Sequence, residues 1–379
     1  MQSAFGVERQ LPRNTTLAVT YSFNRTVHMA QSIPVNTPLP GTFNPALPLS
    51  ATNGLFPYGY SAGTIFETES GGYMRQHLIM VNFNTRFSSK VSLFGNYSLG
   101  YAKDIPSSPT DPYNFAADWG RSNFDRRHNF QLIGNIVAPA NIRLAPFITM
   151  RSGQPYDVLA GEDLYGDTLT NARAVFSSTA TCAGVVRSGN TACSPYGTFS
   201  ANYSVTNPGS LVPRNYLTMP GLVSINMRLY RTFGFGGVPK KTQQADQGPG
   251  GGMPSAGVMG LSGGGRGPGG PGGGPGGPGG GGPPPGGGGG PGGGMGRMMG
   301  MGGDTTEHPY NVTLSVNFEN LLNHLNPGGY QGVITSPYFL QATSVNTGFG
   351  GGGPGGGGPG GFGGAANNRR IQLGIRFTF

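Results

Sequence analysis

The last eleven residues, RRIQLGIRFTF (369–379), alternate apolar and polar side chains and end on an aromatic residue. In an extended segment alternate residues share a face. One face would carry Ile371, Leu373, Ile375, Phe377 and Phe379, and the other Arg370, Gln372, Gly374, Arg376 and Thr378. An apolar strand at a chain end is an exposed edge unless another strand pairs with it. The segment therefore predicts a paired strand whose two faces meet different solvents.

The same alternation recurs along the chain. It is present in residues 14–26, 90–102, 141–152, 221–235 and 310–320. These segments are longer than the five or six residues of an ordinary strand. Helical periodicity is missing over any useful length, and Gly or Pro interrupts each candidate helix. The pattern predicts an all-β chain.

Composition narrows the possibilities further. Much of the glycine, 72 residues in all, lies in two tracts at 248–303 and 348–364, which cannot bury a core. The net charge of +9 comes from scattered arginines, several on polar strand faces, and this argues against a nucleic-acid surface. No segment approaches the roughly 18 apolar residues of a membrane helix, and the N-terminus lacks the regions of a signal peptide.

The connections alternate between tight turns and long, polar loops. RFSSKV (86–91) and VAPANI (137–142) are short, whereas 103–123, 153–220 and 321–367 are long. This asymmetry is typical of a transmembrane β-barrel of the bacterial outer membrane. Counting back from the C-terminus places every long loop outside if residues 63–87 form one strand with a kink at Gly71 and Gly72.

The predicted organisation has three parts. Residues 1–235 are antiparallel transmembrane strands with long extracellular loops. Residues 236–309 are a Gly/Pro/Met-rich disordered insertion on the periplasmic side, where a short turn is expected. Residues 310–379 hold the last two strands, the extracellular loop 321–367 and the aromatic C-terminal strand.

Several segments resemble a known family. SNFDRRHNFQLIGNIVAPANIRLAPFITMRSGQPYDV, GEDLYGDTLTNARAVF, LSVNFENLLNHLNPGGYQGVITSPYF and IQLGIRFTF together resemble the C-terminal half of the barrel in Oar-like TonB-dependent receptors of Acidobacteria-type bacteria. The resemblance covers nearly the whole chain outside the glycine tracts. It implies a barrel of about 22 strands, closed by a plug, that imports substrates with energy passed through TonB. Without a plug or a TonB-contacting segment, and with room for about nine strands, the chain is expected to be a C-terminal fragment.

The resemblance also implies partners and a location. The closing strand, with Ile371, Leu373, Ile375, Phe377 and Phe379, resembles the signal that the barrel-assembly machinery reads. The other expected partners are outer-membrane lipid, the missing N-terminal barrel half and plug, TonB indirectly, and an unidentified ligand. The expected function is ligand uptake across the cell outer membrane. A structural or adhesive surface protein and a secreted soluble β-sandwich remain as alternatives.

Few residues suggest a site. Asp125, Arg126 and Arg127 enter a strand from a long loop and could bind an anionic or sugar ligand, although an ion-pair ladder that holds the strand ends is favoured. Trp119, the only tryptophan, is assigned to an interface or to loop packing rather than to a ligand platform. The five histidines are far apart and no nucleophile motif is present, so we expect neither catalysis nor a cofactor.

Two further features concern the loops. Asp163 and Asp167, with Tyr165 between them, weakly resemble an oxygen-rich calcium loop, but a solvated turn is the favoured explanation. Cys182 and Cys193 are the only cysteines and enclose a short polar stretch. They predict a disulfide in an oxidising location, with two free thiols as the alternative.

Overall fold

The structure is a computed structural model that describes residues 1–202, 210–237, 306–345 and 368–379. Most of the predicted insertion at 236–309, and all of the glycine tract at 348–364, fall outside these residues. The described chain is almost entirely β, as the alternation predicts. Three short 3-10 helices interrupt it: η1 (Tyr60–Ala62), η2 (Phe115–Asp118) and η3 (Pro139–Asn141). In the described ranges no helix is both long enough and apolar enough to span a membrane.

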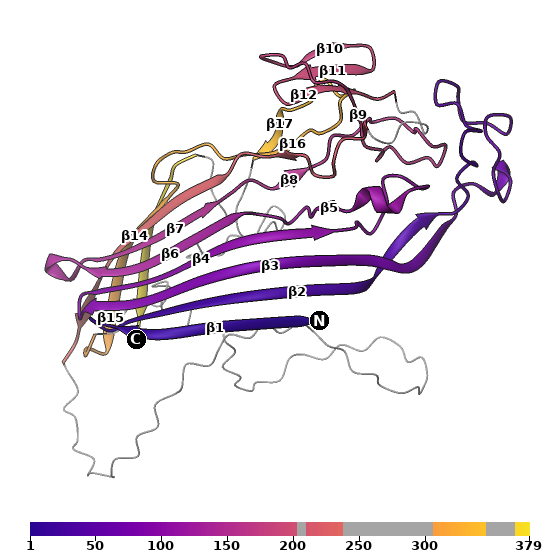
Figure 1. Ribbon diagram of the computed structural model, residues 1–379. Helices are drawn as coiled ribbons and strands as arrows, with labels where there is room; N and C mark the ends of the chain where they lie inside the picture. Colours follow the sequence, from indigo (N-terminus) through magenta and orange to yellow (C-terminus); the bar gives the residue numbers. More distant parts are fainter. Residues whose placement is uncertain (203–209, 238–305, 346–367) are drawn as a thin grey trace, which may run out of the picture.

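One large antiparallel sheet, named the wall, dominates the molecule (Figure 1). Its strands follow the chain in the order β1 (Gln2–Leu11), β2 (Thr15–Pro34), β3 (Phe66–Ser88), β4 (Val91–Asp104), β6 (His128–Val137), β7 (Arg143–Arg151), β14 (Leu222–Phe235), β15 (Tyr310–Glu319) and β18 (Arg370–Thr378). A two-residue strand, β5 (Gly120–Arg121), pairs with the end of β4. Within the described residues β1 pairs only with β2, and β18 only with β15, so these two strands are the edges of the wall.

The two ends of the wall differ in their connections. Tight turns join β1 to β2, β3 to β4 and β6 to β7, and they define the short-turn end. The chain segments 35–65, 105–127, 152–221 and 320–369 leave the opposite, long-loop end. The segment between β14 and β15 leaves the short-turn end, as the sequence count predicts.

The third wall strand carries the predicted irregularity. Residues Phe66–Ser88 form one continuous strand, as the sequence count requires. The pairing of β2 with β3 shifts on both sides of Met29, which lies opposite Gly72. His28 has a positive φ of 59° beside this shift. A bulge bends a strand and increases its twist. The irregularity therefore includes the predicted glycine pair: β2 supplies one extra residue between Thr26 and Met29, and β3 supplies one between Gly72 and Glu69.

Burial on the wall is inverted relative to a soluble sheet. In β14, the side chains of Ser224 and Asn226 are buried, whereas that of Val223, the residue before Ser224, is only half-buried. In β15, Thr313 is 3% exposed and the next residue, Leu314, is 45% exposed. Strand pairing keeps the two sets on separate faces, here named the polar face and the apolar face. A wall with polar residues inside and apolar residues outside suits a watery lumen surrounded by lipid.

Aromatic side chains border the apolar face at both ends. Phe23, His77 and Tyr101 form one row across β2, β3 and β4 near the long-loop end. Tyr310 stacks on Phe377 near the short-turn end. The ten residue steps from His77 to Phe87 on β3 span about 33 Å of strand, or about 25 Å of height at a tilt of about 40°. This matches the height of the lipid-facing band of outer-membrane barrels, which aromatic girdles flank.

The hydrophobic core lies in the connections at the long-loop end rather than in the wall. Its members are Val158, Ala160, Leu164, Tyr165, Ala172, Ala174, Ala192, Phe199, Ala201, Val212, Leu217, Ile334 and Phe339. Most of them come from the connection between β7 and β14, and the last two come from the connection between β15 and β18. This folded region is named the cap. The expectation of simply long, polar loops is thus wrong for these segments, because they fold around apolar side chains of their own.

Short strands give the cap its shape (Figure 1). A four-stranded sheet has the order β10 (Val186–Ser188), β11 (Thr191–Ser194), β12 (Gly197–Ser200) and β9 (Val175–Ser178). Two further pairs are β8 (Pro155–Tyr156) with β13 (Leu217–Thr218), and β16 (Pro327–Tyr330) with β17 (Ala342–Val345). Strands of two to four residues are too short to show alternation in a sequence.

Candidate functional site

Asp125 anchors the connection between β4 and β6 to the wall. Its side chain is buried and accepts hydrogen bonds from the backbone N–H of Ala102 at 2.8 Å and from Nε of Arg121 at 3.0 Å. Arg127 adds an ion pair at 3.3 Å. These partners hold the chain against the end of β4 where the strand ladder stops. The carboxylate is thus committed to internal donors, which agrees with the favoured ion-pair interpretation rather than with ligand contact.

Arg127 and Trp119 pack on the apolar side of the same region. The guanidinium of Arg127 lies 4.0 Å from the ring centre of Tyr101 and also donates to the carbonyl of Gly100. Trp119 stacks on Tyr73 with ring centres 4.3 Å apart. Both contacts combine an apolar surface with a polar tip, which is the environment of a membrane interface. The structure therefore places these two residues in packing contacts.

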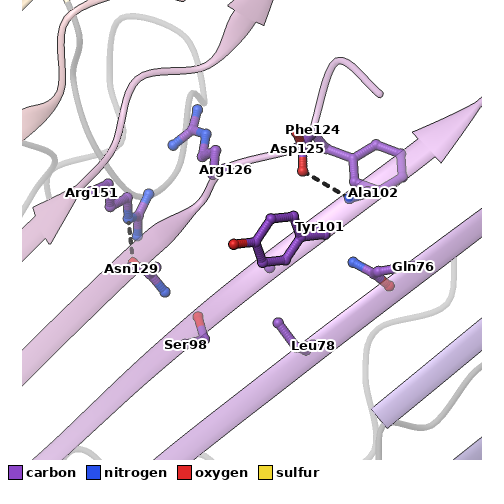
Figure 2. A pocket seen from close by; sticks show the side chains of 11 residues that line it. Gln76, Leu78, Ser98, Tyr101, Ala102, Phe124, Asp125, Arg126, Asn129 and Arg151 are labelled. Atoms are coloured by element: carbon purple, nitrogen blue, oxygen red, sulfur yellow. Dashed lines mark hydrogen bonds between the residues drawn. The ribbon is translucent and has the colours of Figure 1, made fainter. Parts of the chain in front are cut away.

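Arg126 points to the other side and lines a cavity of about 260 Å³ (Figure 2). Polar-face residues from β3, β4, β6 and β7 line it, among them Gln76, Ser98, Asn129 and Arg151. Tyr101 and Phe124 also contribute to the lining. Arg126 donates to Oε1 of Gln154 at 3.0 Å, and Nε of Arg151 donates to Oδ1 of Asn129 at 3.0 Å. Amides thus orient both guanidinium groups, and Figure 2 shows them on the same side of the cavity.

The charges around this cavity favour a negatively charged ligand. The two guanidinium groups are close enough for the charge of Arg126 to act on Arg151. Asp125 also lines the cavity, but its charge is balanced by Arg121 and Arg127. Within the described residues Arg126 forms no ion pair. A carboxylate or phosphate fits the planar fork of an arginine through paired hydrogen bonds. The cavity can therefore hold an anionic group on the lumen side of the wall.

Buried ion pairs fasten the cap over this end of the wall. Arg173 pairs with Asp118 at 2.9 Å, and both side chains are almost completely buried. Arg173 also donates to the carbonyl of Val212 at 2.8 Å. Arg214 pairs with Asp104, the last residue of β4, and donates to its backbone carbonyl. Each pair joins the cap to the connection after β4 or to β4 itself, so the cap is fixed rather than loosely attached.

Asp163 and Asp167 form a turn and do not gather a calcium shell. Oδ1 of Asp163 accepts the backbone N–H groups of Tyr165, Gly166 and Asp167, and its Oδ2 accepts that of Thr168 at 2.8 Å. Four donors occupy the lone pairs that a cation would need. Within the described residues no group of three or more His, Cys, Asp or Glu side chains could hold a metal. The calcium interpretation is therefore replaced by a carboxylate-capped turn.

Asp167 nevertheless has an unusual titration. Burial, followed by the negative charge of Asp163, raises the pKa of Asp167 to about 6. The backbone N–H of Leu169 acts in the opposite direction by donating to its Oδ1. The side chain lies in the cap, where a proton exchanged near pH 6 changes the charge of a packed turn.

The two cysteines are joined in the cap. Cys182 and Cys193 form a disulfide across 11 positions of sequence. Cys193 belongs to β11, and the backbone N–H of Cys182 donates to the carbonyl of Ser194 at 3.0 Å. The bond thus ties the connection after β9 to the four-stranded sheet of the cap.

Within the described residues, the C-terminal strand is paired on one side only. β18 runs antiparallel to β15, with Leu373 opposite Val316 and Ile375 opposite Leu314. Its apolar residues are strongly exposed, at 58% for Ile371, 81% for Leu373, 79% for Ile375, 56% for Phe377 and 93% for Phe379. The predicted pairing is present, and the apolar face of the strand is directed away from protein.

Sequence reasoning missed the residues that complete the cavity and hold the cap. Arg151 and Gln154 line or support the cavity, and Arg173 and Arg214 bind the buried aspartates. Arg173 lies 55 positions from its partner, and Arg214 lies 110 positions from its own. No local spacing could reveal such pairs. The only signal in the sequence was that Arg173 and Arg214 each lie in a long loop with few other charged residues.

A comparison with protein families agrees with this architecture. The family described as outer membrane beta barrel domain matches residues 1–243. Among solved structures, the chain is similar to the outer membrane transporter YddB from Escherichia coli, with 9% sequence identity and a TM-score of 0.42. The match covers 100% of this chain and 32% of the transporter, so this chain spans about a third of that protein's length. A search of curated proteins gave no match.

Proposed function

We propose that this chain, which belongs to the family of outer membrane beta barrel domains and crosses the outer membrane as a multi-pass β-barrel, is the barrel portion of a TonB-dependent, Oar-like receptor. Such a receptor takes up a ligand from outside the cell. The observation that carries this proposal is the cationic cavity on the polar face of the wall, at the long-loop end that also carries the cap. The closing strand and residues 122–158 resemble segments of Oar-like TonB-dependent receptors, which supports the same assignment.

The ligand in this proposal carries an anionic group. Arg126 and Arg151 approach the cavity from the end of a loop and from the end of β7. Amide partners hold both groups, so little side-chain entropy is lost when an anion binds. Loops at the outer rim of a barrel usually carry specificity. The cap would then select the ligand, and the arginine pair would receive its charged group.

The two edges of the wall, unpaired within the described residues, indicate which partners the chain needs. The edge strands β1 and β18 leave backbone groups for pairing, and in lipid each unsatisfied group costs several kcal/mol. We propose that further strands of the same receptor pair with both edges, that a plug closes the lumen and that TonB acts through the plug. The barrel-assembly machinery would read the aromatic residues of β18. The proposed role involves no catalysis.

Uptake provides the test. The gene that contains this barrel is expressed in two strains that differ only in the presence of TonB, and compounds depleted from the medium are measured by mass spectrometry. We expect an anionic compound to be depleted only in the strain with TonB. We also expect Arg126→Gln with Arg151→Gln to remove that difference while the amount of folded barrel stays unchanged. Equal depletion in both strains would refute TonB-dependent uptake.

A structural or adhesive surface protein is the second candidate. The observation that favours it is the cap, which has its own core, its own sheet and a disulfide. An adhesin would retain surface binding in a strain without TonB, and loss of Arg126 and Arg151 would leave that binding unchanged. The same pair of strains therefore separates the two functions.

A further inference from the structure

Three basic residues form a row on the apolar face of the wall. Arg25 of β2 lies opposite Arg75 of β3, and Arg75 lies opposite Lys103 of β4. All three side chains are exposed. They share the face of the aromatic row, which lies one step nearer the short-turn end on the same strands. This set of three is named the cationic row.

The cationic row has no carboxylate partner in the described parts of the chain. None of its side chains forms an ion pair there, and Asp104, beside Lys103, is buried and paired with Arg214. Asp125 is likewise committed to Arg121 and Arg127. Like charges directly opposite one another destabilise a sheet. A row of this kind is stable when an external anion lies against it.

The height of the cationic row above the lipid-facing band indicates which anion can contact it. One step along a strand on the same face is two residues, about 6.6 Å of strand and about 5 Å of height at a tilt of about 40°. The aromatic row of Phe23, His77 and Tyr101 marks the boundary of the lipid-facing band. The cationic row therefore lies at the level of the lipid headgroups, on the outward side of the wall.

A second cavity adjoins the row. Its volume is about 480 Å³, and Lys103, Trp119, Arg121 and Tyr216 are among its lining residues. Trp119 stacks on Tyr73, which precedes Arg75 by one step on the same face of β3. The indole and phenol groups provide an amphipathic border between headgroups and acyl chains. The row and the cavity together offer cations, hydrogen-bond donors and room for a headgroup.

We propose that the cationic row binds the phosphoryl groups of an anionic lipid in the outer leaflet. Phosphate oxygens neutralise Arg25, Arg75 and Lys103, and one phosphoryl group enters the cavity beside Lys103. The acyl chains lie against the apolar face below the aromatic row. This proposal depends on the outer-membrane location and not on transport, so it stands or falls separately from ligand uptake.

Vesicle binding tests the proposal with the complete barrel that contains this chain, folded in phosphatidylcholine vesicles. Vesicles with and without lipid A, which carries two phosphates, are compared. Emission from Trp119, the only tryptophan of residues 1–379, is taken as the difference from a Trp119→Phe barrel and reports occupation of the neighbouring site. We expect lipid A to change this emission and dephosphorylated lipid A to leave it unchanged. Replacing Arg25, Arg75 and Lys103 together by Gln should weaken the apparent affinity roughly 100-fold, or about 5-fold for each cation.

Matched variants separate specific binding from general charge. Arg9→Gln with Arg231→Gln removes two apolar-face cations at the short-turn end and should change the affinity less than about 2-fold. Arg25→Lys with Arg75→Lys keeps the charge and should retain most binding. If the triple variant does not fold, Lys103→Gln alone must still show its 5-fold loss.

Three results would overturn the proposal. The first is an unchanged affinity in the Lys103→Gln variant, and the second is an equal loss in the short-turn-end control. The third is competition by inorganic phosphate at concentrations comparable to those of lipid A, which would identify a site for a free anion instead of a lipid.

Discussion

An arginine on the apolar face should destabilise the barrel far more than an arginine at the same depth on the polar face. Val81 of β3 lies opposite Val19 and Tyr97 on the apolar face. It is four residues from His77 and six from Phe87, which places it about 10 Å and about 15 Å in height from the two borders of the lipid-facing band. Val81 is therefore close to the bilayer midplane.

The cost follows from that depth. Arginine at the midplane of a barrel's lipid face costs about 2 to 4 kcal/mol, so Val81→Arg should lower the folding equilibrium constant about 30- to 700-fold. The neighbouring Met80 lies opposite Thr20 and Ser98 on the polar face. Met80→Arg should cost less than about 1 kcal/mol, because the new charge meets water and polar side chains.

Folding of the complete barrel that contains this chain into phosphatidylcholine vesicles, at graded urea concentrations, measures both variants, with Val81→Leu as the apolar control. Gel mobility without heating and emission of Trp119 report the folded fraction. Equal costs at positions 80 and 81 would refute the assignment of one face to lipid and would favour a soluble sandwich.

Four further predictions address the cap and the edges. Asp118→Ala should leave the buried charge of Arg173 without its carboxylate partner and lower the stability of the cap by about 3 to 5 kcal/mol. The cap should then become sensitive to protease while the wall stays intact. Glu69→Ala, which removes an exposed carboxylate, is the control. Replacing Cys182 and Cys193 by Ser should destabilise the cap by about 2 to 3 kcal/mol, measured by protease resistance, whereas resistance equal to that of the parent would show that the disulfide is dispensable. Because the folded-state pKa of Asp167 is raised from 3.8 to about 6, the folded cap binds the extra proton, so its stability should fall as pH rises from about 4 to about 6, by up to about 3 kcal/mol; Asp167→Asn should flatten this pH dependence of protease resistance. Residues 1–379 expressed alone with a signal peptide should aggregate or be degraded rather than form a heat-modifiable band, because β1 and β18 leave unpaired backbone groups in lipid; a stable conducting monomer would contradict this.

Alternation predicts the wall well because lipid and lumen impose opposite chemistry on alternate residues. Ser224 and Val223 differ in burial for the same reason that they differ in polarity, and this regularity extends over strands of nine or more residues. The glycine pair on β3 marked a distortion, but the division of the extra residues between β2 and β3 depends on the register of the two strands. Register is a tertiary property, and alternation within one strand does not determine it.

The cap was beyond sequence reasoning for a different reason. Its strands have two to four residues, and its core uses many alanines, which do not stand out among the small residues of a loop. The ion pair of Arg173 with Asp118 joins segments 55 positions apart. The lumen cavity depends on the same kind of long-range contact, because its lining comes from four strands and one loop. The cluster Asp125 to Arg127 was predicted as a group, but its division into inward and outward side chains required the backbone path.

The junction between wall and cap explains how one short segment can serve both. Asp104, Asp118 and Asp125 lie within or beside the connection after β4, and each is buried against a different arginine or arginine pair. A strand that leaves its ladder exposes unpaired backbone groups, and Asp125 satisfies one of them at Ala102. These contacts commit the carboxylates of Asp104, Asp118 and Asp125 to holding the junction. Arg126 lies among them with only an amide partner in the described chain, and it points into the lumen cavity. The junction therefore preorganises the guanidinium of Arg126, so the anion binding proposed for Arg126 and Arg151 needs no movement of the cap to create the site.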